Sequence, residues 1–166
     1  IEAYAFTNNR ELLTLKIPAS VTTIGTYAFT YCRNLTTVTN LTKVRRFEEG
    51  VFSNCYNLSS IYTGDVHYFG TKAFSNCSKL KTVSTRALRE MGDSVFYKCT
   101  SLQEISIPNT VKSIGKQTFY GCTALKRISF TSAVTAIGDA AFYDCKALSG
   151  VYYGGTEEQW NAITIG

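Results

Sequence analysis

Apolar residues return at fixed positions along almost the whole chain, in the order Ala-Phe, two residues, Cys, two residues, Leu, two residues and an aliphatic residue. Successive phenylalanines are 22 or 23 residues apart, at Phe6, Phe29, Phe52, Phe74, Phe96, Phe119 and Phe142. This period is too short for a pair of packed helices and matches one strand with one return segment. We therefore predict a solenoid in which each repeat forms one rung and buries its apolar side against the neighbouring rungs.

Each repeat ends in a short alternation of inward and outward positions, which predicts a strand. The inward aliphatic residues are Leu15, Val38, Ile61, Val83, Ile105, Ile128 and Val151. The outward residues form two rows across the expected sheet, Thr14, Thr37, Ser60, Thr82, Glu104, Arg127, Gly150 and Lys16, Thr39, Tyr62, Ser84, Ser106, Ser129, Tyr152. The return segment has the pattern Val-x-x-Ile-Gly at 21–25, 111–115 and 134–138, and other apolar residues hold the two core positions elsewhere.

Two departures from the pattern carry information. The repeats that enter Phe74 and Phe96 are one residue short and lack an Ile-Pro pair, so we expect a tighter bend in those rungs. Ile1 aligns with Ile24, so the chain begins in the middle of a repeat. Because solenoid ends need caps, we expect the chain to be part of a longer protein, or the ordered part of one.

The C-terminal residues have the features of a cap. Thr156 and Gln159 have the spacing of a helix capping box, and Trp160 is placed to cover the last rung. We therefore expect two parts, a solenoid of about seven repeats over residues 1–153, the first repeat incomplete, and a capping segment over residues 154–166.

The repeat resembles the BspA-like class of leucine-rich repeats, which is found in surface proteins of anaerobic bacteria and some protists. The best-matching stretches are LLTLKIPASVTTIGTYAFTYC, from Leu12 to Cys32, and LQEISIPNTVKSIGKQTFYGC, from Leu102 to Cys122. The resemblance implies an α/β-type solenoid, a right-handed coil with one short parallel strand per repeat and a mostly irregular or short-helical return segment. It also implies an extracellular or cell-surface location and adhesion to host proteins or other cells, including binding to the extracellular matrix. The family has no shared catalytic residues.

Composition agrees with one elongated repeat domain. The chain has 166 residues, 45% of them apolar, and can bury a continuous core. No apolar run is long enough to cross a bilayer, so membrane insertion is not expected. The net charge of +5 is modest, and nucleic acid is a poor candidate partner.

The cysteines occupy a single position of the repeat, at Cys32, Cys55, Cys77, Cys99, Cys122 and Cys145. An even number is compatible with three disulfides between adjacent rungs, and the spacing of strands does not exclude them. Stacked side chains point in parallel, however, which favours free, buried thiols beside the phenylalanines. A zinc site is not expected, because there is no Cys-x-x-Cys pair and only one histidine.

The chain offers no convincing catalytic group. His67 has no Ser or Cys nucleophile in a recognisable context, and it falls at a position expected to face solvent. No glycine-rich loop suited to phosphate is present. We therefore expect no enzymatic activity and no cofactor.

Three surface features are candidates for binding. A basic row of Arg45, His67, Arg89 and Lys112 follows the return-segment aliphatic residue and could attract acidic glycans or acidic proteins, although a solvated edge is the alternative. Outward sheet residues such as Thr39, Tyr62, Ser84 and Ser106 could bind protein or glycan, or could simply be good strand formers. The residues after the phenylalanines change from Thr7, Thr30, Ser53 and Ser75 to Tyr97, Tyr120 and Tyr143, which suits either an interface or a stacked ladder.

These features favour a cell-surface or secreted module that binds a protein on host or neighbouring cells. Two alternatives stay open. The chain could be a structural spacer that holds another domain away from the cell, or a glycan-binding module that uses the hydroxyl rows and tyrosines.

Overall fold

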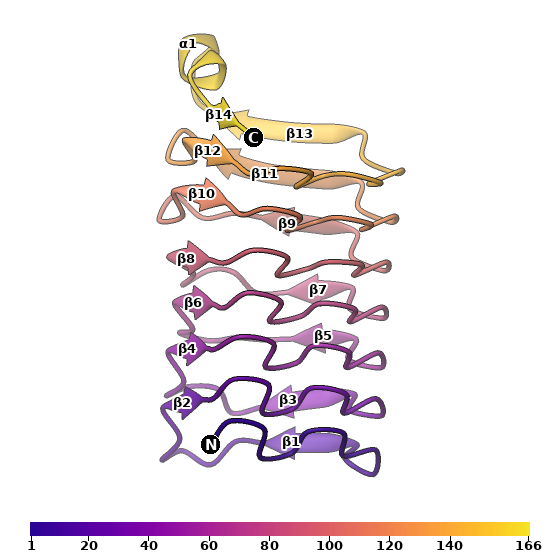
Figure 1. The fold of residues 1–166 in the computed structure, drawn as a ribbon. Coiled ribbons are helices and arrows are strands. Elements are labelled where there is room, and N and C mark those ends of the chain that lie inside the picture. Colours follow the sequence, from indigo (N-terminus) through magenta and orange to yellow (C-terminus); the bar gives the residue numbers. More distant parts are fainter.

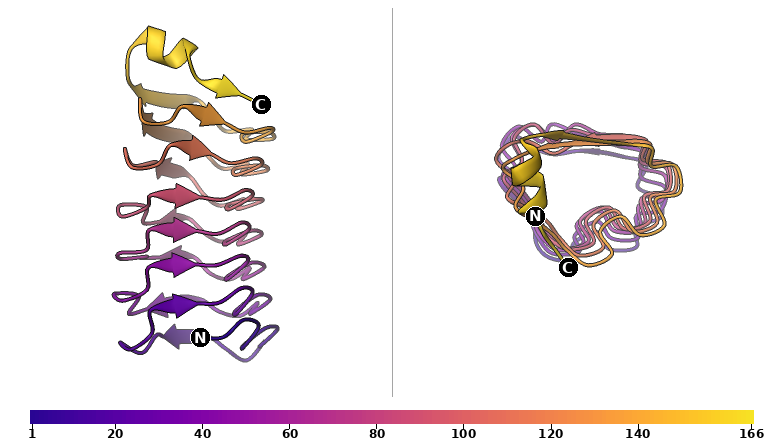
Figure 2. Two further views of the ribbon diagram at one scale, coloured as in Figure 1. Left: turned by 60° about the vertical axis from the view of Figure 1, so that its left-hand side comes forward. Right: turned by 90° about the horizontal axis from the view of Figure 1, so that it is seen from above.

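The computed structural model describes residues 1–166, which form a coil of stacked rungs with the two chain ends at opposite ends of the stack (Figures 1 and 2). Viewed along the stack, the rungs superimpose closely, and each has a side with the longer strands, a side with shorter strands and a side made of turns (Figure 2). The predicted solenoid is therefore confirmed.

The strands of one side follow the alternation in the sequence, and most of them are longer than those of the other side. They are β1 (Thr14–Lys16), β3 (Thr37–Thr39), β5 (Ser60–Ile61), β7 (Thr82–Val83), β9 (Glu104–Ser106), β11 (Arg127–Thr131) and β13 (Gly150–Gly154). Their pairing is parallel, and equivalent residues of neighbouring repeats are partners, such as Leu15 with Val38 and Ile128 with Ile105. The register expected from the sequence is thus confirmed.

The return segments contain a second set of short strands where the sequence predicted irregular or short-helical structure. They are β2 (Thr23–Ile24), β4 (Arg46–Phe47), β6 (Tyr68–Phe69), β8 (Glu90–Met91), β10 (Ser113–Ile114), β12 (Ala136–Ile137) and β14 (Thr164–Ile165). They also pair in parallel, for example Phe47 with Phe69. Each pairing joins only two residues per strand, too few to leave an alternating pattern in the sequence.

The third side of each rung is a series of turns that begins before the phenylalanine and ends near the cysteine. Its backbone groups bond from rung to rung, as in Phe29 N–H to Val51 O at 3.0 Å and Phe52 N–H to Ala73 O at 2.9 Å. Two positions in each rung have positive φ, and most are not glycine. This regular backbone replaces the helix found on the return side of many repeat folds.

The core is one continuous apolar cluster around the phenylalanine ladder. Ring centroids of successive phenylalanines are 5.1–5.9 Å apart, and the rings are nearly parallel. All six cysteines are free thiols, five of them buried. Each Sγ donates to the carbonyl of the phenylalanine in the preceding rung, as in Cys55 to Phe29 O at 3.2 Å.

The two short rungs use threonine where most of the longer rungs use an apolar residue. Thr63 and Thr85 are buried, and their hydroxyl groups donate to the carbonyls of Ser84 and Ser106 in the next rung. The sheet hydrogen bonding is interrupted after these rungs, between β7 and β9 and between β8 and β10, and also before them, between β3 and β5. The pairing therefore changes on both strand sides at the end of the short rungs.

The C-terminal end carries the short helix α1 (Glu157–Asn161), which lies over the last rung (Figure 1). Thr156 and Gln159 form the predicted capping box. The Trp160 ring packs against Tyr153 and Phe130, with centroid distances of 5.3 Å and 6.1 Å. The structure contains no helix both long and apolar enough to cross a membrane.

Candidate binding surface

The side formed by β1, β3, β5, β7, β9, β11 and β13 presents the two outward rows predicted from the sequence; we call it the sheet face. Pairings such as Lys16 with Thr39 and Ser129 with Ser106 align these rows across rungs. Most of these outward side chains are exposed, while the aliphatic residues between them pack inward. The sheet face is therefore a regular array of mostly short hydroxyl side chains, with a few long charged or aromatic ones among them.

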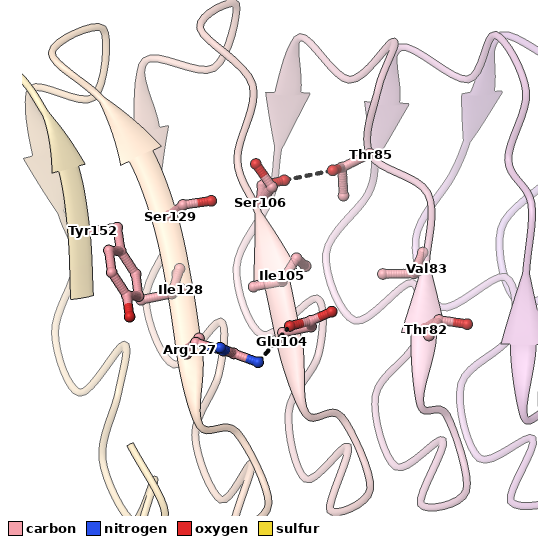
Figure 3. A pocket seen from close by; sticks show the side chains of 10 residues that line it. All are labelled: Thr82, Val83, Thr85, Glu104, Ile105, Ser106, Arg127, Ile128, Ser129 and Tyr152. Carbon is pink, nitrogen blue, oxygen red and sulfur yellow. Dashed lines mark hydrogen bonds and ion pairs between the residues drawn. The ribbon is translucent and has the colours of Figure 1, made fainter. Parts of the chain in front are cut away.

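A depression of about 550 Å³ interrupts this array between β7 and β13 (Figure 3). Ile105 and Ile128 form its buried floor, and Val83 is half-buried at one end. The depression begins at the last short rung, where the sheet hydrogen bonding is interrupted. The hollow with its apolar floor thus lies beside this interruption.

Charged and aromatic side chains surround the floor. Arg127 Nη2 lies 3.5 Å from Glu104 Oε2, and both side chains are largely exposed. The Tyr152 ring, from β13, stands at the other end and is 58% exposed (Figure 3). Gly150 makes room for it, because a Cβ there would lie 2.9 Å from the ring. An exposed ion pair adds little stability, so these groups are available to a partner.

Ser106 and Ser129 add hydroxyl groups to the lining (Figure 3). An apolar floor with an exposed tyrosine, an ion pair and hydroxyl groups is the composition of a protein-binding patch, in which aromatic and arginine side chains anchor a partner. No group of three His, Cys, Asp or Glu side chains is close enough to hold a metal ion.

The predicted sheet residues lie on this face but are spread along it. Thr39, Tyr62, Ser84 and Ser106 occupy successive rungs, and only Ser106 lines the depression. Tyr62 is 73% exposed and directly follows β5. The alternation places Arg127, Glu104 and Tyr152 in the outward rows, but nothing in the repeat pattern distinguishes them from the other outward residues. The signal that could have selected them is the change in repeat length beside β9.

The predicted basic row lies on the other strand side, at the start of the short strands. The N–H of His67 donates to the carbonyl of Arg45, and that of Arg89 to His67, each at 2.8 Å. The four residues therefore do come from successive rungs. The His67 side chain is half-buried, whereas those of Arg45, Arg89 and Lys112 are exposed.

Nearby carboxylates neutralise part of this row. Arg45 Nη1 lies 3.4 Å from Asp65 Oδ2, and Arg46 Nε lies 3.0 Å from Glu48 Oε1. The ion pairs of the chain do not include Arg89 or Lys112. The uncompensated positive charge of the row is thus confined to its C-terminal part.

Comparison with sequence families gives a match to the BspA type leucine-rich repeat region, over residues 1–99 and 89–159. Comparison with curated proteins gives no significant match.

Several solved structures are similar. A leucine-rich repeat protein of T. pallidum is 26% identical with a TM-score of 0.81, over 87% of this chain and 74% of its own. A leucine-rich cell surface protein of Faecalibacterium prausnitzii is 27% identical with a TM-score of 0.56, over 99% of this chain. A leucine-rich repeat protein of Bacteroides ovatus is 28% identical with a TM-score of 0.59, over 87% of this chain. The chain spans 65% of the F. prausnitzii structure and 45% of the B. ovatus structure.

Proposed function

Because the chain belongs to the BspA type leucine-rich repeat family, we propose that it is a non-enzymatic protein-binding module of a bacterial cell-surface or secreted protein. The description of the F. prausnitzii structure as a cell surface protein supports this location. We further propose adhesion to host or neighbouring cells, with extracellular-matrix proteins as candidate partners. In this proposal residues 1–153 are the binding solenoid and residues 154–166 are its cap.

The depression on the sheet face is the observation that carries the proposal. It combines a buried apolar floor at Ile105 and Ile128 with an exposed tyrosine and an exposed ion pair. Tyrosine and arginine dominate the energetics of many protein interfaces because they bury a large area and also form hydrogen bonds. The rows through Thr39, Tyr62 and Ser84 would extend the contact toward the N-terminal rungs.

The test compares binding to immobilised fibronectin, laminin and collagen. The double variant Tyr152→Ala with Arg127→Ser removes two anchors from the depression, and we expect at least a tenfold loss of affinity, the size of effect seen when such anchors are truncated. Tyr143→Ala is the matched control, since Tyr143 is 61% exposed but lies on the turn side.

If the parent binds none of these proteins, the structural spacer becomes the better hypothesis. If the parent binds and the double variant binds equally well, the contact lies elsewhere, and the basic row is the next surface to test with acidic glycans.

A further inference from the structure

The turn side carries a second groove of about 550 Å³, separate from the sheet face. It runs along the stack from the first rungs to Tyr97 and Gln117. The outline of the coil bends inward on this side when it is viewed along the stack (Figure 2). Neither the proposed protein-binding surface nor the core accounts for this groove.

Small hydroxyl residues at the position after the phenylalanine create the groove. Thr30, Ser53 and Ser75 hold this position in successive rungs and are buried at 5–6% exposure. In the following rungs the same position is tyrosine. The rings of Tyr97 and Tyr120 stack with centroids 4.9 Å apart, and the ladder continues to Tyr143. The groove is therefore open where the residue is small and ends where the tyrosine ladder begins.

Aromatic rings line the N-terminal part of the groove. Tyr4 and Tyr27 stack with centroids 5.6 Å apart, and Tyr31 adds a further ring that is 40% exposed. The Tyr27 ring lies against Gly50, where any Cβ would overlap it, and its hydroxyl group donates to Glu49. This hydrogen bond raises the pKa of Tyr27 to about 12. The rings are thus held in place before a ligand arrives.

Amide groups form a connected row beside the floor. Asn76 Nδ2 donates to Asn54 Oδ1 at 3.0 Å, and Asn54 Nδ2 donates to Ser53 Oγ at 2.9 Å. Because Ser53 Oγ accepts this bond, its hydroxyl hydrogen can donate into the groove. The row therefore presents donors and acceptors at the rung spacing, which is about 4.8 Å.

The groove is almost uncharged, and its backbone is already paired. Lys72 is the only charged residue among the 13 that line it. The N–H groups of Tyr31, Asn54 and Asn76 donate to carbonyls of the next rung at 2.7–2.9 Å. A peptide strand therefore finds no free sheet edge to extend. An acidic ligand would meet Lys72, with Arg33 and Lys98 over the Tyr31 and Tyr97 rings, but also the Glu49 carboxylate at the Tyr27 hydroxyl group.

We propose that this groove binds a neutral carbohydrate chain of β-linked hexopyranose units. Sugar rings carry C–H groups that can contact the exposed parts of Tyr4 and Tyr31, and their hydroxyl groups pair with the amides and hydroxyls found here. The rungs form a straight stack (Figure 1), so an extended β-linked chain fits along it better than a coiled α-linked chain. This site is independent of the protein-binding surface proposed above.

Calorimetric titration of the whole chain with two β-linked hexasaccharides, cellohexaose and β-mannohexaose, tests the proposal. Maltohexaose, an α-linked chain that coils, is the control. Ser75→Tyr fills the groove with the residue that the fold already accommodates at Tyr97, so we expect an unchanged Tm and at least a tenfold loss of affinity. Tyr97→Ser lengthens the groove by one rung and should strengthen binding of the β-linked chains. Both variants should bind matrix proteins like the parent, because the sheet face is unaltered.

Three results would overturn the proposal. The parent could fail to bind both β-linked chains, Ser75→Tyr could bind them as tightly as the parent, or maltohexaose could bind equally well. Because the double variant Tyr152→Ala with Arg127→Ser leaves the groove intact, its oligosaccharide binding should match that of the parent even if the sheet face proves to have no protein partner.

Discussion

The rings of Phe74 and Phe96 lie parallel in neighbouring rungs, with centroids 5.6 Å apart and an interplanar angle of 2°. Both side chains are fully buried. This contact recurs along the stack, so each rung contributes one ring to a shared apolar column. Stability in such an array comes from the interfaces between neighbouring rungs.

Replacing Phe96 with alanine should therefore open a cavity in the column. We expect Phe96→Ala to lower the free energy of unfolding by about 3–5 kcal/mol, measured by denaturant titration. Phe6→Ala is the control, because Phe6 holds the same repeat position but is 42% exposed, and its loss should be much smaller. Equal losses for the two variants would contradict this account of the core.

The buried thiols should be protected in the folded protein. A thiol reagent should modify Cys145 first, because it is half-buried, and should reach Cys77 only after unfolding. Unfolding without reductant should then expose all six thiols. A count below six would show that some of them form disulfides.

Alkaline pH should destabilise the fold through the same thiols. Burial is the main reason that the pKa of Cys77 rises from 9.0 to about 12 and that of Cys145 to about 11. Below pH about 9 these thiols are protonated in both states, so they add no pH dependence. Above pH about 9 the thiols ionise in the unfolded state but not yet in the folded state. The free energy of unfolding therefore falls until the thiols of the folded state ionise too. In the variant Cys77→Ala, the urea midpoint should fall less between pH 9 and 11 than in the parent. An equal fall in the two proteins would show that the Cys77 thiol does not cause the alkaline loss of stability.

The charge of the basic row should act mainly through Arg89 and Lys112. Arg45 already has Asp65 at 3.4 Å, so Arg45→Glu should change retention on a heparin column less than Arg89→Glu, which changes the net charge by the same amount. Retention of the parent should fall steeply with salt, because exposed charges are screened within about 8 Å at physiological ionic strength. If none of the variants differs from the parent, the row is a solvated surface.

The C-terminal helix should lose stability when its capping box is removed. We expect Thr156→Ala to cost about 1 kcal/mol, because the Gln159 N–H loses its acceptor. Trp160 is the only tryptophan, so its fluorescence reports unfolding at this end. Thr14→Ala, on β1 at the opposite end, should leave the fluorescence transition unchanged.

The candidate surfaces were only partly predictable. The alternation placed Ser106, Glu104 and Arg127 on one exposed face, and the structure agrees. The depression among them forms where side chains of four neighbouring rungs meet, which no single repeat encodes. The charge of the basic row was overestimated for a similar reason, since Asp65 approaches Arg45 only after the chain has coiled.

The sequence by itself determined the solenoid, its register, the phenylalanine and cysteine columns and the capping box, because each depends on a pattern that recurs at a fixed period or on a local spacing. The tertiary structure decided what lies between rungs. It added the second row of short strands, the half-burial of His67, the hollow beside β9 and the groove above Ser53 and Ser75. Those features arise from small differences in side-chain size and repeat length between adjacent rungs, and such differences acquire a shape only when the rungs are stacked.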